Sequence, residues 1–270
     1  MDSHDIRKYR PTSFKDFVGA KNQQIATRIQ NAILQGKPPS PLLVIATFGR
    51  GKTSFIRHVL LSINCSTRDP ITADPCLVCS QCVCSGQRYF GHGHPYRRHE
   101  YDCTVLGRAD VCELINTHYF EDRDALFLDE LHHLNEKHSQ EPLLKFVEEF
   151  PGLLFAAVML DKFDGVIPPL RERFERIQMY PPTSDELVAF FEMKAVEWEL
   201  IAPQQLIQMM VGMSNGSFRA CLKTFAAAAE SDRTLTEEIL EAAFGSIDQR
   251  QGHHGDQSWD ETSEESLFAV

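Results

Sequence analysis

Short apolar runs along the chain predict buried strands, and segments with helical spacing lie between them. The runs cover residues 42–45 (LLVI), 125–128 (ALFL) and 153–160 (LLFAAVML). Apolar runs of this length are typical of strands that are covered on both faces. Apolar positions recur every three or four residues in segments 23–35, 54–63 and 141–150, which predicts helices there. The pattern therefore predicts an α/β core.

From residue 184 onward every apolar segment has helical spacing. The predicted helices span residues 184–198, 203–213, 217–230 and 234–244. Pro181 to Ser184 reads as a linker followed by a helix cap, and Thr234 with Glu237 reads as a capping box. Gly245 is expected to end the last helix. We therefore expect a core over residues 1–179, a small helical domain over 180–245 and a disordered acidic tail over 246–270. Residues 85–123 show no clear pattern.

Composition changes this picture in two respects. The 270 residues carry a formal charge of −11, which argues against non-specific coating of nucleic acid but not against a local basic patch. The start, MDSHDIRKYRP, has no apolar segment of the secretory kind, and the run at 153–160 is too short to cross a membrane. We therefore expect a cytoplasmic protein, in which eight cysteines indicate metal binding or free thiols rather than disulfides.

The first apolar run leads directly into a phosphate-binding pattern. Gly49, Gly51, Lys52 and Thr53 follow the strand and precede a helix, as in the P-loop G-x-x-x-x-G-K-[ST], although Ala46 occupies the first position. Glycines let backbone N–H groups surround phosphates, lysine adds a positive charge, and the threonine hydroxyl is a ligand for Mg²⁺. The alternative is a surface Gly-Lys-Thr turn. The flanking strand and helix favour a site for ATP and Mg²⁺.

The second apolar run ends in two carboxylates, Asp129 and Glu130. In a P-loop ATPase this is the Walker B position, where the aspartate holds the Mg²⁺ shell and the glutamate polarises the attacking water. The alternative is an acidic first turn of a helix. The P-loop earlier in the chain favours the catalytic interpretation.

Clustered cysteines follow the P-loop helix. Four thiolates joined by two C-x2-C turns suit tetrahedral Zn²⁺, and no open coordination position is indicated, so we expect a structural zinc module over about residues 65–84. Either Cys82 or Cys84 provides the fourth ligand, and a set of free cysteines is the alternative. We expect His92 and His94 to be loop residues, and Cys103 and Cys112 to be small core residues. The expected zinc ligands are Cys65, Cys76, Cys79 and Cys82.

Basic residues form two further clusters, at Arg7, Lys8 and Arg10 and at Arg171, Arg173 and Arg176. The first is placed to reach a nucleotide or DNA, or is a solvated basic segment. The second follows the third apolar run. It either reaches a phosphate of a neighbouring subunit or pairs with the intervening glutamates in solvent.

With these pieces the chain resembles the AAA+ clamp-loader ATPases, from about Arg7 to Ala229. The resemblance implies an AAA+ P-loop NTPase core with a parallel sheet, an inserted zinc-binding module and a small all-α lid domain. The segments that carry it are RKYRPTSFKDFVGA (7–20), GRGKTS (49–54), the Cys65–Cys82 cluster, LDELHHL (128–134), IPPLRERF (167–174) and NGSFRACL (215–222).

The resemblance also implies roles for single residues. Arg173 resembles the arginine finger that acts on a neighbouring subunit, and Arg219 resembles the sensor 2 arginine that touches the nucleotide of its own subunit. Arg10 would border the adenine pocket. The expected catalytic residues are Glu130 and Arg173. The expected nucleotide-site residues are Arg10, Ala46, Gly49, Arg50, Gly51, Lys52, Thr53, Ser54, Asp129 and Arg219.

Several positions depart from the family pattern. The family usually has glycine at Ala46, threonine where the sensor 1 strand here has Val158 or Met159, and serine at Glu172. An apolar side chain cannot orient a phosphate by a hydrogen bond, so hydrolysis is expected to be slow. The chain also stops before a collar domain, so assembly would depend on the AAA+ edges or on another protein.

Two functions follow from this resemblance. The first is an ATP-binding switch with weak to moderate ATPase activity, acting in an oligomer with other AAA+ subunits on DNA, in replication, repair or mobile-element and defence transactions. The second is a non-hydrolysing scaffold that uses nucleotide and zinc structurally. The final Glu265-Ser-Leu-Phe268 resembles peptides that bind the sliding clamp, or is an unstructured end.

Overall fold

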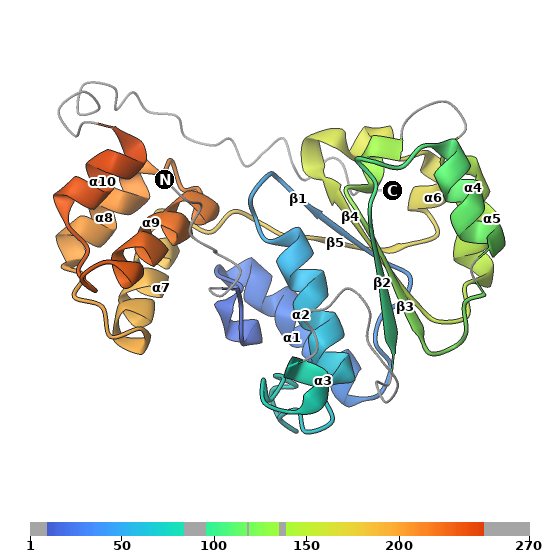
Figure 1. Cartoon of the computed structure of the whole chain (residues 1–270), viewed down its shortest axis with the longest axis horizontal. Coiled ribbons are helices and arrows are strands. Elements are labelled where there is room, and N and C mark those ends of the chain that lie inside the picture. The colour runs from blue at the N-terminus through green and yellow to red at the C-terminus, as the bar shows by residue number, and fades with distance from the viewer. Residues whose placement is uncertain (1–9, 84–95, 118, 135–138, 246–270) are drawn as a thin grey trace.

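A five-stranded parallel sheet forms the centre of the molecule, followed by a group of four helices (Figure 1). The computed structural model describes residues 10–83, 96–117, 119–134 and 139–245. Within these residues the strand order is β2-β3-β4-β1-β5. The strands are β1 Leu42–Ala46, β2 Arg97–Asp102, β3 Asp124–Asp129, β4 Leu153–Met159 and β5 Glu175–Gln178.

The strand register brings the predicted site residues to one edge of the sheet. Ala46, the last residue of β1, lies opposite Met159, the last residue of β4, and β3 ends with Asp129 at the same edge of the sheet. Helix α2 (Lys52–Asn64) begins a few residues after β1. In open parallel sheets ligands bind outside the carboxyl ends of the strands, so this edge is where a nucleotide is expected.

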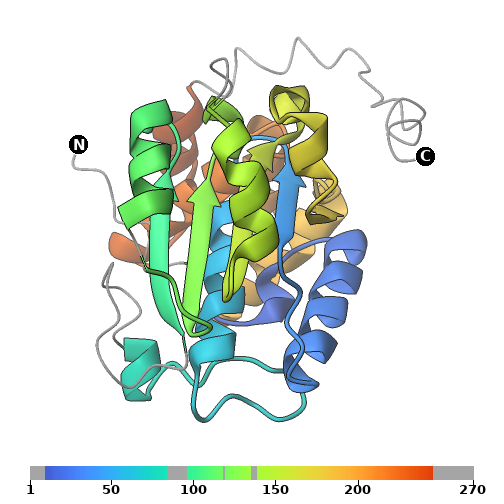
Figure 2. The same ribbon diagram turned by 90° about the vertical axis from the view of Figure 1, so that its right-hand side faces the viewer.

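Helices cover both faces of the sheet (Figure 2). Successive residues of β1 face opposite ways, so Leu42 and Val44 pack with α1 (Ala20–Leu34) and α2. Leu43 and Ile45 pack with the helices on the other face, and all four side chains are fully buried. The helices of this second face are α4 Arg108–Thr117, α5 Glu141–Glu149 and the short α6 Pro168–Arg171.

The segment without a clear pattern contains the edge strand β2 and helix α4. Strand β2 has the sequence RRHEYD. Its polar side chains form ion pairs with other parts of the core, where the other strands make apolar contacts. Arg97 and His99 both contact the buried carboxylate of Asp124, at 2.8 and 2.9 Å, and Arg57 pairs with Glu100. Because an edge strand has a neighbour on one side only, it does not need an apolar run. Short helical turns complete the core at η2 Phe14–Asp16, α3 Ser80–Val83, η4 Leu131–Leu134 and η5 Leu160–Gly165.

The four C-terminal helices have a hydrophobic core of their own. Thr183 caps the first of them and forms a capping box with Glu186, as the linker pattern predicts. The capping box predicted at Thr234 is wrong. Thr234 forms a β-bridge with Ile201, and Thr236 caps the last helix instead. The helices are α7 Ser184–Glu197, α8 Gln204–Met213, α9 Phe218–Glu230 and α10 Glu237–Phe244.

A buried ion pair connects the helical group to the core. The ammonium of Lys194 on α7 lies 2.8 Å from the carboxylate of Asp16 in the N-terminal segment. Both residues are buried, and Asp16 also accepts hydrogen bonds from the backbone of Thr12 and Ser13. The predicted domain boundaries at 179/180 and 245/246 stay predictions, and the acidic tail lies outside the described residues. None of the described helices has the length and apolar content needed to span a membrane.

Candidate nucleotide-binding site

The loop after β1 has the backbone shape that phosphate binding needs. Gly49 and Gly51 have φ of 76° and 85°, a region that favours glycine, and Gly51 directly precedes α2. The first N–H groups of a helix have no partner within the helix and bind anions well. Ala46 lies within β1 without a positive φ, so its methyl group fits where the P-loop pattern has its first glycine.

Lys52 points into the sheet edge rather than into solvent. Its side chain is 5% exposed, and its Nζ lies 3.5 Å from the carbonyl oxygen of Ala46 and 3.7 Å from Oε1 of Glu130. Burial lowers the pKa of Lys52, while the carboxylates of Glu130 and Asp129 oppose this shift. Burying a charged lysine is costly unless the charge has a purpose. The ammonium group of Lys52 is placed where it could neutralise the charge of a bound phosphate.

Thr53 and Asp129 are in direct contact. The Thr53 hydroxyl donates to Oδ2 of Asp129 at 2.9 Å, which joins the start of α2 to the end of β3. Burial raises the pKa of Asp129, and the hydrogen bond from Thr53 opposes this shift. A hydroxyl and a carboxylate side by side are the oxygen ligands that Mg²⁺ takes in P-loop ATPases, so these two residues fit the predicted ion.

Glu130 has a carboxylate oxygen that is buried and accepts no hydrogen bond from the described residues. That oxygen, Oε2, lies 3.5 Å from Nδ1 of His132. Burial lowers the pKa of His132 and favours the neutral imidazole, while the carboxylate of Glu130 opposes this shift. The backbone of Glu130 has φ of 53°, which is rare outside glycine and common at functional sites. Such a carboxylate is suited to polarising a water molecule.

The predicted sensor 1 strand ends at the same edge. Val158 is fully buried, whereas the next residue, Met159, is partly exposed at the end of β4. The Met159 N–H lies 3.5 Å from Nδ1 of His132. The side chain at the end of the predicted sensor 1 strand is therefore a thioether, which donates no hydrogen bond.

Two arginines connect the loop after β1 with the helical group. The Arg219 guanidinium, near the start of α9, lies 4.8 Å from the ring centre of Phe48. Arg50, in the loop after β1, donates to the backbone carbonyl of Gly216 in the helical group. Arg219 also lies close enough to Lys52 to lower its pKa. Ser54 follows on α2 and is half-buried.

The predicted arginine finger, Arg173, is engaged within its own chain. It pairs with Glu148 on α5 at 2.7 Å and donates to the carbonyl of Pro169. Its neighbour Arg171 pairs with Asp164 at 3.1 Å. The Arg173 side chain is 28% exposed and its pair with Glu148 is partly solvated, although its Nε atom is buried.

Arg10 is the one residue of its predicted basic cluster that the structure describes. It is exposed and lines a small cavity with residues of α7 and α9, among them Phe190 and Phe218. Arg7 and Lys8 lie outside the described residues. The position of Arg10 beside the adenine pocket stays a prediction.

Four of the cysteines converge in the loop after α2. The Sγ atoms of Cys65, Cys76, Cys79 and Cys82 all lie within 4.8 Å of one another. Two of the pairs are separated by 3.9 and 4.0 Å, close to the spacing of about 3.8 Å that tetrahedral Zn–S bonds produce and far from a disulfide. Backbone N–H groups of Cys76 and Cys79 donate to sulfur atoms of the cluster, at 3.2 and 3.3 Å.

This geometry fits a structural zinc ion and places Cys82 in the cluster. Cys84, His92 and His94 lie outside the described residues. Cys103 is buried in the core, while Cys112 on α4 is only half-buried.

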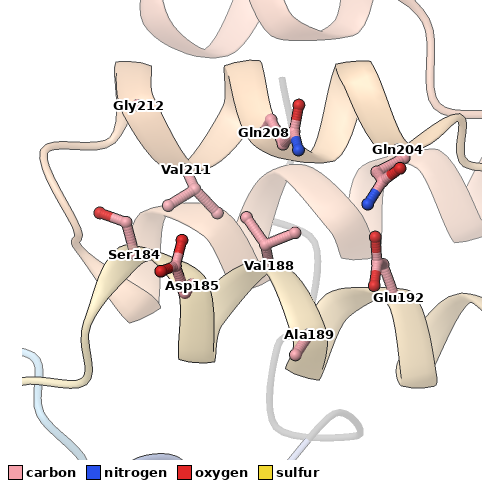
Figure 3. A pocket seen from close by; sticks show the side chains of 9 residues that line it. All are labelled: Ser184, Asp185, Val188, Ala189, Glu192, Gln204, Gln208, Val211 and Gly212. Atoms are coloured by element: carbon pink, nitrogen blue, oxygen red, sulfur yellow. The ribbon is translucent and has the colours of Figure 1, made fainter.

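A groove of about 410 Å³ lies between α7 and α8 (Figure 3). The carboxylate of Glu192 on α7 faces the amide of Gln204 on α8 across it. None of its lining residues belongs to the P-loop or to the end of β3, so it is separate from the nucleotide site. The lining residues are Ser184, Asp185, Val188, Ala189, Glu192, Gln204, Gln208, Val211 and Gly212.

Sequence patterns did not single out His132 or Phe48 as site residues. His132 lies within LDELHHL, but only the fold shows that it turns back towards Glu130 and β4. Phe48 is 66% exposed, which is unusual for a phenylalanine. The available signal was an aromatic residue directly before the first P-loop glycine, Gly49.

Comparisons with known proteins agree with this architecture. No family model matches the chain. The chain is 26% identical over 256 residues to the DNA polymerase III subunit gamma of Buchnera aphidicola (subsp. Baizongia pistaciae), covering 93% of this chain and 64% of that protein. It is 28% identical over 266 residues to the DNA polymerase III subunit tau of Escherichia coli K12, covering 91% of this chain and 38% of that protein.

Solved structures show the same fold. The Thermotoga maritima RuvB Holliday junction branch migration motor superimposes with a TM-score of 0.56 at 18% identity, over 87% of this chain and 71% of that one. This likeness confirms the predicted α/β fold with a parallel sheet and following helices. Together the comparisons confirm the resemblance read from the motifs: the chain is similar in sequence to the DNA polymerase III gamma and tau subunits, and it shares the AAA+ fold of the RuvB motor.

Proposed function

We propose that the chain is a clamp-loader-like AAA+ protein that binds ATP and Mg²⁺, hydrolyses ATP at a weak to moderate rate and acts in an oligomer on DNA. The observation that carries this proposal is the contact of 2.9 Å between Thr53 and Asp129. It joins the P-loop to the acidic end of β3 at the edge where Lys52 and Glu130 also meet. A surface Gly-Lys-Thr turn would have no reason to gather these four polar groups and to bury Lys52 among them.

The mechanism follows from the positions of these groups. Backbone N–H groups of residues 49–53 and the Lys52 ammonium bind the β- and γ-phosphates, and Thr53 and Asp129 would hold Mg²⁺, which supplies charge neutralisation when bound. Glu130 orients and polarises the attacking water with its unpartnered oxygen. Arg219 contacts the nucleotide from the helical lid, and Arg173 of a neighbouring subunit stabilises the charge of the transition state.

The binding partners of the protein and the DNA process in which it acts are proposals that rest on its similarity to the gamma and tau subunits. The chain spans 64% and 38% of the lengths of the gamma and tau relatives, so their whole activity does not transfer to it. We place the protein in the cytoplasm with other AAA+ subunits, in DNA replication, repair or a mobile-element or defence process. Contact with a sliding clamp would use the tail, which lies outside the described residues. The cysteine cluster would hold one structural Zn²⁺.

A second function is favoured by one observation. Met159 stands at the end of β4 beside Ala46, where a hydrogen-bond donor would orient the γ-phosphate. A scaffold that binds nucleotide without hydrolysing it would tolerate this residue. Turnover of the purified protein, measured with and without DNA, separates the two functions: a stoichiometric nucleotide that stays unhydrolysed supports the scaffold.

The site assignment is tested with Lys52→Ala. Loss of a buried, charge-assisted contact to phosphate should weaken ATP binding by at least about tenfold, measured by titration with a fluorescent ATP analogue and Mg²⁺. Lys145→Ala is the matched control, because Lys145 is 80% exposed on α5 and forms a surface pair with Glu149. Unchanged affinity of the Lys52 variant would show that nucleotide does not bind at this edge.

A further inference from the structure

The turn that joins α8 to α9 has a defined shape. Asn215 and Gly216 both have positive φ, of 50° and 68°, and the Ser217 N–H closes the turn on the carbonyl of Ser214 at 3.0 Å. Ser214 is buried. It donates to the carbonyl of Val211 at 2.8 Å and lies 3.0 Å from the thiol of the buried Cys221. These contacts hold the backbone of the turn in one conformation.

Two side chains of the P-loop reach this turn and the helix after it. Arg50 donates to the carbonyl of Gly216, and Phe48 lies under the guanidinium of Arg219 at 4.8 Å. Between them, Gly49 is so close to α9 that a Cβ added there would lie 3.7 Å from Cβ of Arg219. In a P-loop the phosphates are held by backbone N–H groups, so the side chains at positions 48 and 50 are available for another role.

We propose that Arg50 is a positioning residue that fixes the lid over the nucleotide site, with Phe48 as the second contact. The hydrogen bond of Arg50 connects the α8–α9 turn to the P-loop, and this connection positions Arg219 at the start of α9. A change in the backbone of residues 47–51 when phosphate binds is then passed directly to the lid. The effect on nucleotide affinity rests on the proposed function, whereas the effect on lid position does not.

The test compares Arg50→Ala and Arg50→Lys with the wild type in the full chain. Fluorophores on unnatural residues at the exposed positions Gln24 of α1 and Glu241 of α10 report the distance between core and lid. We expect Arg50→Ala to widen the distance distribution without nucleotide and to weaken ATP binding by about 5- to 20-fold. Arg50→Lys, which keeps a charged donor, should restore part of both effects.

Arg233→Ala is the matched control, because Arg233 is an exposed lid arginine whose contact with Glu199 at 2.9 Å stays within the lid. It should change neither readout. Unchanged distances in Arg50→Ala overturn the proposal. If affinity falls while the distances stay the same, Arg50 contacts the nucleotide itself and the proposal is also wrong. Failure of the nucleotide site is recognised separately, by Lys52→Ala binding ATP as the wild type does.

Discussion

Glu130 shows how much depends on a single carboxylate at the sheet edge. One of its oxygens lies 3.7 Å from the Lys52 ammonium, and the other is buried without a hydrogen bond from the described residues. Leaving a buried carboxylate oxygen unpaired is costly for folding. The cost is understandable if the group serves water activation, which requires an acceptor that the protein itself does not occupy.

We expect Glu130→Gln to separate binding from hydrolysis. The amide has the same shape but cannot take up a proton, so turnover should fall by about 10²- to 10⁴-fold while ATP affinity stays within about threefold. Steady-state phosphate release and equilibrium titration measure the two quantities. Glu149→Gln, at an exposed position on α5, is the control. Equal turnover in Glu130→Gln and wild type would exclude Glu130 as the base.

Among the elements, the cysteine loop is linked to the rest of the core by polar contacts. Asp74, two residues before Cys76, accepts from the Ser13 hydroxyl at 2.8 Å and from the Phe14 N–H at 2.7 Å. Gln30 on α1 donates to the carbonyl of Thr72 at 2.6 Å. The loop therefore connects the N-terminal segment with α1, and a metal that orders the loop also orders these contacts.

Cys79→Ser should remove most of the bound zinc and lower the midpoint of thermal unfolding by roughly 5–10 °C. Serine is a poor ligand for zinc, and three thiolates do not close the tetrahedron. Elemental analysis and a melting curve measure the two effects. Cys112→Ser is the control, because Cys112 lies on α4, outside the cysteine cluster. A purified wild type without zinc, or equal zinc content in Cys79→Ser, would contradict the metal assignment.

At the scale of the whole molecule, polar contacts join the lid to the core. Lys194 pairs with Asp16, and Arg50 bonds to Gly216. Arg173, in contrast, bonds to Glu148 within the core, through a pair whose side chains are 28% and 56% exposed. Partly exposed ion pairs contribute little to stability, so Arg173 can leave Glu148 for a neighbouring subunit at small cost.

A mixing experiment tests this role of Arg173. Arg173→Ala should keep the ATP affinity of the wild type but lower turnover of the assembled protein by about 100-fold or more. Mixing Arg173→Ala with Lys52→Ala subunits should restore part of the activity, because some interfaces then combine an intact P-loop with an intact arginine. Arg28→Ala, an exposed arginine paired with Glu175, is the control. No recovery on mixing, with both variants shown to assemble together, would mean that Arg173 acts within its own subunit.

The sequence by itself determined the elements whose signal is local. The apolar runs of β1, β3 and β4 and the helical spacing of α5 and α7 to α9 are local patterns, and their physical origin is burial on one or both faces. The P-loop and the cysteine spacing are also readable, because phosphate and zinc binding need particular residue types at short separations. The polar edge strand β2 was not readable, since its charges are satisfied by Asp124 and Arg57 from elsewhere in the chain.

Only the tertiary structure decided which distant groups meet. The contact of Thr53 with Asp129 depends on β1 and β3 ending at the same sheet edge, with β4 between them. Likewise, that Arg50 and Phe48 face the α8–α9 turn depends on the packing of the lid against the core. A local pattern encodes what a segment buries, whereas the partner of a polar side chain is set by the whole fold. The contacts of Arg50, His132 and Glu148 therefore became visible only in three dimensions.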